Sequence, residues 1–214
     1  TSPPRLIVRI KIGAPISEVT RPIGSSRGAN ALLAKVSAVS KIIAPINAQQ
    51  EIELFDLGDI IGVANALSNN DVCAVIIECV QGVGGLDEST TSFYKRLHHL
   101  CKKFNVVLIA DEVQSGFGRT GDFFAFQKHK IIPDIISMAK GMGNGFPIGG
   151  ILIHPKIKAS FGLLGTTFGG NHLACTASLT VLEVIKKEKL QENAKIIFDY
   201  FKKEAQSLPH LKAI

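Results

Sequence analysis

Apolar residues recur along this chain in two spacings, and the alternation between them is the main structural signal. Short apolar runs closed by turn residues predict buried strands, and apolar residues three or four positions apart predict helices that bury one face. Strands are predicted at 8–12, 51–57, 72–78, 106–110, 134–139 and 149–153. Helices are predicted at 59–67, 89–104, 174–187 and 191–208, with a shorter one at 31–39. This order favours an α/β fold, with a mostly parallel sheet flanked by helices.

Two of the predicted strands lead into residues of opposite charge. The strand at 106–110 is followed directly by Asp111 and Glu112. The strand at 134–139 is followed by Lys140. Ligands of open α/β sheets bind just beyond the carboxyl ends of the strands. We therefore expect Asp111 and Lys140 to meet at one ligand site.

A lysine and an aspartate at one site have a specific chemical use. A lysine amine that loses its proton can form a Schiff base with an aldehyde. An aspartate can hold a pyridine nitrogen protonated, so that the ring accepts electrons during carbanion chemistry. Either residue alone at a strand end is more often a solvated terminus or a helix cap. The pair therefore carries the argument.

Three long motifs surround this pair. They read ADEVQSGFGRTG at 110–121, MAKGMGNGFPIGG at 138–150 and TTFGGN at 166–171. In content, order and spacing they resemble the class III aminotransferases, which are pyridoxal-phosphate enzymes of fold type I. Within that family they are most similar to the acetylornithine, succinylornithine and ornithine enzymes. The resemblance extends over about residues 41–208.

The resemblance implies a role for each matching residue near the cofactor, pyridoxal 5'-phosphate. Lys140 would bind the cofactor covalently and then move a proton during the reaction. Asp111 would pair with the pyridine nitrogen. Val113 would press its methyl groups against the ring, and Gln114 would donate a hydrogen bond to the phenolic oxygen.

Four further residues would border this site. Glu78 and Gln81 would lie at the substrate pocket, although a simple strand-ending turn explains them equally well. Thr167, with Thr166 beside it, would reach the cofactor phosphate of the partner subunit in a homodimer with shared active sites. A loop and cap before the following helix is the other interpretation of that motif. Many relatives carry a glutamate where this chain has Val83, which argues against an ornithine-type donor.

Some family motifs have no counterpart in this chain. The sequence lacks the Ser-Gly-Thr-Glu-Ala turn that cradles the phosphate and the Phe-His-Gly-Arg-Thr segment with its substrate arginine. It also ends before the carboxylate-binding arginine of the small domain. We therefore divide the chain into an unmatched segment (1–40), a partial cofactor-binding large domain (41–188) and the beginning of a small C-terminal domain (189–214). A truncated or frame-disrupted gene product is one hypothesis for this pattern.

The activity implied by the resemblance is amino transfer from N-acetylornithine or N-succinylornithine to 2-oxoglutarate, in arginine biosynthesis. Two alternatives remain open. One is a different enzyme of the family, such as ornithine or 4-aminobutyrate aminotransferase. The other is an inactive truncated homologue that acts only as a binding or dimer partner.

Composition restricts the class of protein further. The 214 residues are 46% hydrophobic and 20% charged, which is ordinary for a globular protein. The net charge of +6 comes largely from lysines interleaved with glutamates, so we expect a solvated surface and no nucleic-acid partner.

Cysteine and histidine positions exclude two further kinds of site. Cys73 and Cys79 fall on one predicted strand about 20 Å apart, too far for a disulfide, which favours a reduced, cytoplasmic protein. His98 and His99 lack the spacing of a metal site. No apolar run approaches the roughly 20 residues that cross a bilayer, so no membrane partner is expected.

Overall fold

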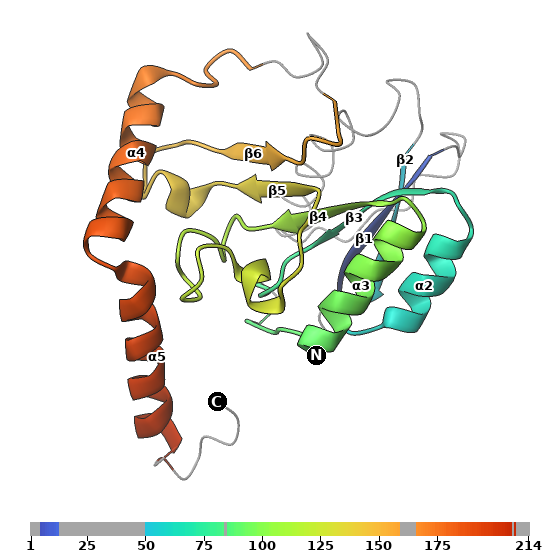
Figure 1. Ribbon diagram of the computed structural model, residues 1–214, viewed down its shortest axis with the longest axis horizontal. Helices are drawn as coiled ribbons and strands as arrows, with labels where there is room; N and C mark the ends of the chain where they lie inside the picture. Colours follow the sequence, from blue (N-terminus) through green and yellow to red (C-terminus); the bar gives the residue numbers. More distant parts are fainter. Residues whose placement is uncertain (1–4, 13–49, 84, 159–165, 207, 209–214) are drawn as a thin grey trace.

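The computed structural model describes residues 5–12, 50–83, 85–158, 166–206 and 208. Its described strands form one six-stranded sheet in the order β2-β1-β3-β4-β5-β6 (Figure 1). The strands are β1 (Arg5–Ile12), β2 (Gln50–Asp56), β3 (Val72–Ile77), β4 (Val107–Asp111), β5 (Ile135–Met138) and β6 (Gly150–Ile153). All six predicted strands are therefore confirmed to within a few residues. The helix predicted at 31–39 lies outside the described residues.

The predicted α/β fold with flanking helices is confirmed, and its described sheet is mixed rather than mostly parallel. Only the central strands β3, β4 and β5 run parallel to one another. Strand β1 is antiparallel to both β2 and β3, and β6 is antiparallel to β5. The short connection between β5 and β6 contains no long crossover helix, and antiparallel pairing suits such a connection. An apolar run alone does not distinguish the two pairings, so the prediction extended the parallel arrangement too far.

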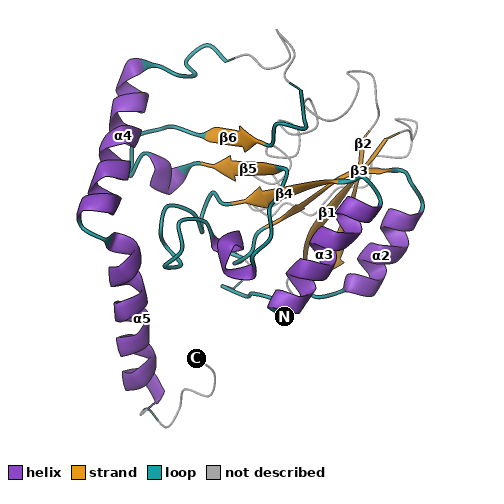
Figure 2. Cartoon of the chain, viewed as in Figure 1, coloured by secondary structure: helices purple, strands orange, loops and turns teal. Residues whose placement is uncertain are grey.

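The helices occupy two places around the sheet. Figure 2 shows α2 (Ile60–Ser68) and α3 (Thr91–Lys103) side by side against one part of it. Helix α4 (His172–Lys187) lies near the carboxyl ends of β4 and β5, and α5 (Leu190–Gln206) continues beyond it. All four long helices match their predicted ranges closely. Two short 3₁₀ helices follow the central strands: η2 (Ala125–His129) and η3 (Lys140–Met142).

Side-chain caps explain where three of these helices begin. Asp59 accepts a hydrogen bond from the backbone N–H of the third residue of α2, and Thr90 does the same for α3. Asn171 of the TTFGGN motif caps α4 by accepting from the backbone N–H of Ala174 at 2.9 Å. Each cap satisfies a donor that the helix itself cannot pair. The cap interpretation of Asn171 is therefore confirmed.

The core divides between the two faces of the sheet because successive strand residues point to opposite sides. On one face, Val75 and Leu108 pack with apolar residues of α2 and α3, including Leu67 and Leu97. The opposite face carries a smaller buried cluster of Ala74, Ile76, Ile109 and Ile135. Burial of each large aliphatic side chain stabilises the fold by about 1.5–3 kcal/mol. The central strands are thereby held rigidly, and so are the residues that follow them.

A buried tyrosine ties the start of α3 to the end of β3. The Tyr94 hydroxyl donates to the Cys79 carbonyl at 2.9 Å and accepts from the Ser89 backbone N–H at 3.1 Å. Its ring stacks on buried His129, with centroids 4.1 Å apart. The Thr91 hydroxyl lies 3.0 Å from His129 Nδ1. This cluster fixes both ends of the segment between β3 and α3.

Acidification is expected to destabilise the fold through His129. Burial lowers the pKa of this imidazole, and the nearby charge of Lys128 lowers it further. The unfolded chain therefore binds more protons than the native one between the ordinary histidine pKa and the lowered value, so stability falls as pH falls through that window. Urea unfolding between pH 7.5 and pH 5 should show a decreasing midpoint. The decrease should be smaller in His129→Gln, and an identical decrease in this variant would contradict the assignment.

Candidate active site

Asp111 is the last residue of β4, and hydrogen bonds hold its carboxylate in place. The side chain is only 3% exposed. Its Oδ1 accepts from the Val113 backbone N–H at 3.1 Å and from the Ser137 hydroxyl at 3.1 Å. Ser137 is the register partner of Asp111 on the parallel strand β5. The sheet register therefore orients a buried carboxylate at the carboxyl ends of two adjacent strands.

Lys140 begins the turn that follows β5. Its backbone has a φ of +43°, in the left-handed region that residues other than glycine rarely adopt. Its carbonyl accepts from the backbone N–H groups of Gly143 and Asn144, both at 3.1 Å. These bonds hold the strained backbone, and such strain is concentrated at functional sites. The Lys140 side chain itself is exposed.

A pocket of about 390 Å³ opens beside Lys140. It is formed by segments that follow β3, β4 and β5, namely Val80, Gly82, Leu86, Gln114, Ser115, Arg119, Thr120 and Lys140. The volume is within the range of small-molecule sites. Of the residues predicted to bind the cofactor, Lys140 and Gln114 line this pocket. Asp111 and the half-buried Val113 are not among its lining residues.

Glu78 and Gln81 shape the turn after β3 and do not line this pocket. Glu78 Oε2 accepts from the backbone N–H of Gly82 at 3.1 Å. A methyl group added at Gly82 would collide with the side-chain amide of Gln114, so the glycine lets Gln114 lie against the turn. Gln81 is fully buried, and neither side-chain polar atom has a hydrogen-bond partner in the described part of the chain. A substrate-pocket role for Glu78 and Gln81 stays a prediction.

Thr166 and Thr167 lie in the exposed loop before α4. They are not among the lining residues of the Lys140 pocket. The structure contains a single chain, so the predicted contact of Thr167 with a partner subunit's phosphate stays a prediction.

Glu112 is a buried acid to which the sequence patterns gave no role. Its Oε2 accepts from the Ser115 hydroxyl at 2.7 Å and the Ala125 backbone N–H at 3.0 Å, and its Oε1 accepts from the Phe126 N–H at 3.0 Å. Burial raises the pKa of this carboxyl, and the hydrogen bonds oppose that shift only in part. Glu112 anchors η2 to the end of β4. The two consecutive acids after a buried strand could have indicated this role. Successive side chains of a strand point to opposite faces of the sheet, so Asp111 and Glu112 have different surroundings.

Replacing Glu112 with glutamine is expected to destabilise the fold. Among the described residues, every group that hydrogen-bonds to its two oxygens is a donor, so the glutamine NH₂ must face a backbone N–H and leave it unpaired. One buried unsatisfied donor costs about 1–3 kcal/mol. Urea unfolding at pH 7 measures the loss, and Glu88→Gln is the matched control because Glu88 is exposed and pairs with Lys128 at the surface. An equal midpoint for Glu112→Gln and the parent would show that the anchor is dispensable.

Arg119 lies in the loop after β4, beside Lys140. In the described residues it forms no ion pair, and its side chain is exposed. It lines the Lys140 pocket and also an adjoining pocket of about 330 Å³ against α4. A second cation therefore faces the space beside Lys140, and no carboxylate lines the Lys140 pocket in the part of the chain described. This charge favours anionic ligands.

Other kinds of site find little support. All four cysteines are free. Within the described ranges, no group of three His, Cys, Asp or Glu residues could hold a metal ion. The same residues contain no helix that is both long and apolar enough to traverse a membrane.

Fold and site together define an α/β domain with an aspartate and a lysine at the ends of adjacent parallel strands, the arrangement expected of the large domain of a type I pyridoxal-phosphate enzyme. The chain belongs to the class III aminotransferases, because the sequence model of the family described as "Aminotransferase class-III" matches residues 20–213. This match begins inside the segment 1–40 that the motifs left unassigned, and the predicted division into domains stays a prediction.

Individual relatives agree with this family. The chain is 45% identical over 139 residues to alanine–glyoxylate aminotransferase 2 homolog 2, mitochondrial, of Arabidopsis thaliana, covering 64% of this chain and 29% of the relative. It is 43% identical over 144 residues to acetylornithine aminotransferase of Aquifex aeolicus, covering 66% and 38%.

A solved structure of ornithine aminotransferase from Toxoplasma gondii, described with partial occupancy of pyridoxal phosphate (PLP) at its active site, superposes with a TM-score of 0.71. Its sequence is 34% identical, and the match covers 76% of this chain and 40% of that one. The chain thus spans well under half the length of these relatives.

Proposed function

We propose that this chain supplies the cofactor-binding part of a pyridoxal-phosphate-dependent aminotransferase. Its amino donor is N-acetylornithine or N-succinylornithine, and its acceptor is 2-oxoglutarate. The observation that supports the proposal is the parallel pairing of β4 with β5, because buried Asp111 ends β4 and exposed Lys140 follows the end of β5. The similarity to acetylornithine aminotransferases from Aquifex and other organisms supports the choice of donor.

The residues present fit the cofactor. A pyridine nitrogen needs a buried anionic acceptor, and Asp111 is a buried carboxylate whose position is set by Ser137. An aldehyde needs an amine, and the phenolic oxygen beside it needs a donor. Lys140 and Gln114 line one pocket and supply these two groups. When bound, pyridoxal phosphate supplies an electron sink that stabilises negative charge on the substrate carbon.

The chain's own residues then divide the work. Asp111 keeps the pyridine nitrogen protonated by placing an opposite charge beside it. Lys140 Nζ would be the amine that holds the cofactor aldehyde, and the free amine would accept the proton from the substrate carbon. Gln114 orients the ring through its side-chain amide. Arg119 adds positive charge at the pocket wall, which suits the carboxylates of both substrates.

The amino donor has two rivals supported by specific observations. The Arabidopsis relative carries an alanine–glyoxylate name at an identity similar to that of the acetylornithine relatives. The Toxoplasma structure carries an ornithine name. Against free ornithine, no acid among the described residues lines the Lys140 pocket, where a second ammonium group would need one. An acylated donor removes that ammonium and fits the apolar wall formed by Val80 and Leu86.

A donor panel tests this proposal. Purified chain with added pyridoxal phosphate is offered N-acetylornithine, N-succinylornithine, ornithine, 4-aminobutyrate and alanine, and glutamate formed from 2-oxoglutarate is measured. We expect the acylated donors to give the highest kcat/KM, with Lys140→Ala as the blank. Highest activity with ornithine would refute the donor assignment. Cofactor binding without turnover of any donor would instead support the inactive homologue that acts as a binding partner.

The assembly proposed for this enzyme is a cytoplasmic homodimer. Large apolar side chains are exposed on α4 and α5, including Leu173, Leu179, Ile196, Phe198 and Phe201. Contiguous exposed apolar surface is typical of an interface. Sedimentation of the purified chain should therefore show dimers, whereas a monodisperse monomer at micromolar concentration would contradict the proposal.

A further inference from the structure

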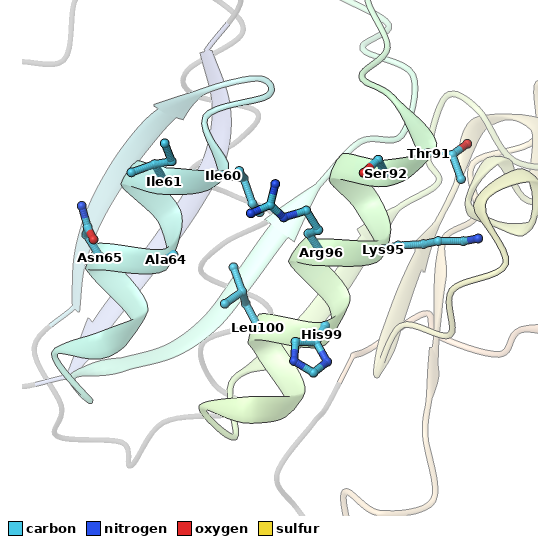
Figure 3. Close-up of a pocket in the computed structure, with 10 residues that line it drawn as sticks. All are labelled: Ile60, Ile61, Ala64, Asn65, Thr91, Ser92, Lys95, Arg96, His99 and Leu100. Atoms are coloured by element: carbon cyan, nitrogen blue, oxygen red, sulfur yellow. The ribbon is translucent and has the colours of Figure 1, made fainter.

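A further cavity lies between α2 and α3, on a part of the fold that the proposed reaction does not use. Its volume is about 660 Å³, and it is open to solvent. Figure 3 shows that its residues come from these two helices alone. The apolar part consists of Ile60, Ile61, Ala64 and Leu100. We call this cavity the α2–α3 groove.

The aliphatic side chains of the α2–α3 groove are at least partly exposed to solvent. Ile61 is 71% exposed, and Ile60 and Leu100 are only partly buried. A helix face that carries aliphatic side chains beside a hollow of this size can cover an aliphatic ligand. Small-molecule sites of proteins have volumes in the same range.

The charge of the α2–α3 groove is entirely positive. No aspartate or glutamate lines it in the described part of the chain, whereas Lys95 and Arg96 do. In Figure 3 the Arg96 side chain extends across the gap toward Ile60 of α2, and Lys95 points away from α2. Arg96 has no hydrogen bond or ion pair with any described residue. One unpaired guanidinium therefore faces the apolar residues.

We propose that the α2–α3 groove binds a small amphiphilic carboxylate. Arg96 holds the carboxylate, because its planar fork of N–H donors matches the two oxygens. The aliphatic tail lies on Ile60, Ile61 and Leu100, where it removes apolar surface from water. The site contacts both the carboxylate and the aliphatic tail of the ligand. A short carboxylate and an uncharged alcohol of the same length should therefore both bind more weakly.

Octanoate is the probe that tests this site. The ¹⁵N-labelled chain of 214 residues is titrated with octanoate, acetate and 1-octanol, and backbone amide shifts are followed. We expect saturable shifts in α2 and α3 with octanoate, and at least about tenfold weaker binding of the other two compounds. Absence of saturable shifts, or equal affinity for 1-octanol, would overturn the proposal.

Two charge substitutions on α3 separate the site from general attraction. Arg96→Gln is expected to weaken octanoate binding about tenfold, since it removes the charged fork. Lys102→Gln removes the same charge from an exposed position of α3 outside the groove and should change the affinity less than about twofold. Equal effects of the two substitutions would show nonspecific attraction and refute the site. If Arg96→Gln fails to fold, Arg96→Lys keeps the charge without the fork and should still weaken binding measurably.

Discussion

Alanine in place of Lys140 is expected to abolish covalent capture of pyridoxal phosphate and to lower amino transfer by at least about 10³-fold. In the proposed function this residue supplies both the amine that holds the aldehyde and the base that moves the substrate proton. Borohydride reduction of the parent protein with the cofactor, followed by peptide mapping, should locate the adduct at Lys140. The Lys140→Ala protein should yield no adduct in the peptide that contains residue 140 or at any other lysine in comparable amount.

Lys130 provides the matched control for this experiment. It is also exposed, and it also adopts a left-handed backbone conformation, with a φ of +55° after η2. Lys130→Ala removes an equivalent amine at a position that does not line the Lys140 pocket. Covalent capture and amino transfer should therefore remain at parent levels. A major adduct on Lys130, or on another lysine while Lys140 stays unmodified, would contradict the assignment of Lys140.

The sequence predicted the elements of the fold well because the signals were local. The run of apolar residues through Ile109 could only be buried, and the acid that followed it had to lie at a strand end. The caps at Thr90 and Asn171 were also predictable, since a side chain of the right length bonds an N–H only three residues away. The pairing of strands with one another was not encoded in the local sequence. The direction of β6 is the example, since its apolar run suits either pairing.

The site was predictable to the extent that it depends on strand ends. Asp111 and Lys140 reach the same edge because β4 and β5 are parallel neighbours, and the motifs indicated both residues. The supports of the site could not be predicted in the same way. Ser137, which orients Asp111, is identified only by the register of two strands that are separated in sequence. Glu112 is identified by its contact with η2, a segment with no apolar period to mark it.

Asparagine in place of Asp111 is expected to slow amino transfer by about 10²–10⁴-fold, with little effect on folding. The substitution keeps the size of the side chain, and the asparagine oxygen can still accept from the Ser137 hydroxyl and the Val113 N–H. It removes the negative charge that is proposed to hold the pyridine nitrogen protonated. The measurement is the rate of proton exchange at the donor carbon that carries the free amino group, compared with the urea midpoint of the same protein.

The control for charge is Asp122→Asn, in the loop that follows the same strand. Asp122 pairs with Lys195 at 3.1 Å on the surface, and its loss should leave the exchange rate close to that of the parent. A slow exchange rate in Asp111→Asn with an unchanged urea midpoint assigns the effect to the charge at β4. If exchange is as fast as in the parent, Asp111 is only a structural acceptor for Ser137, and the proposed electron sink needs another anionic partner at this edge of the sheet.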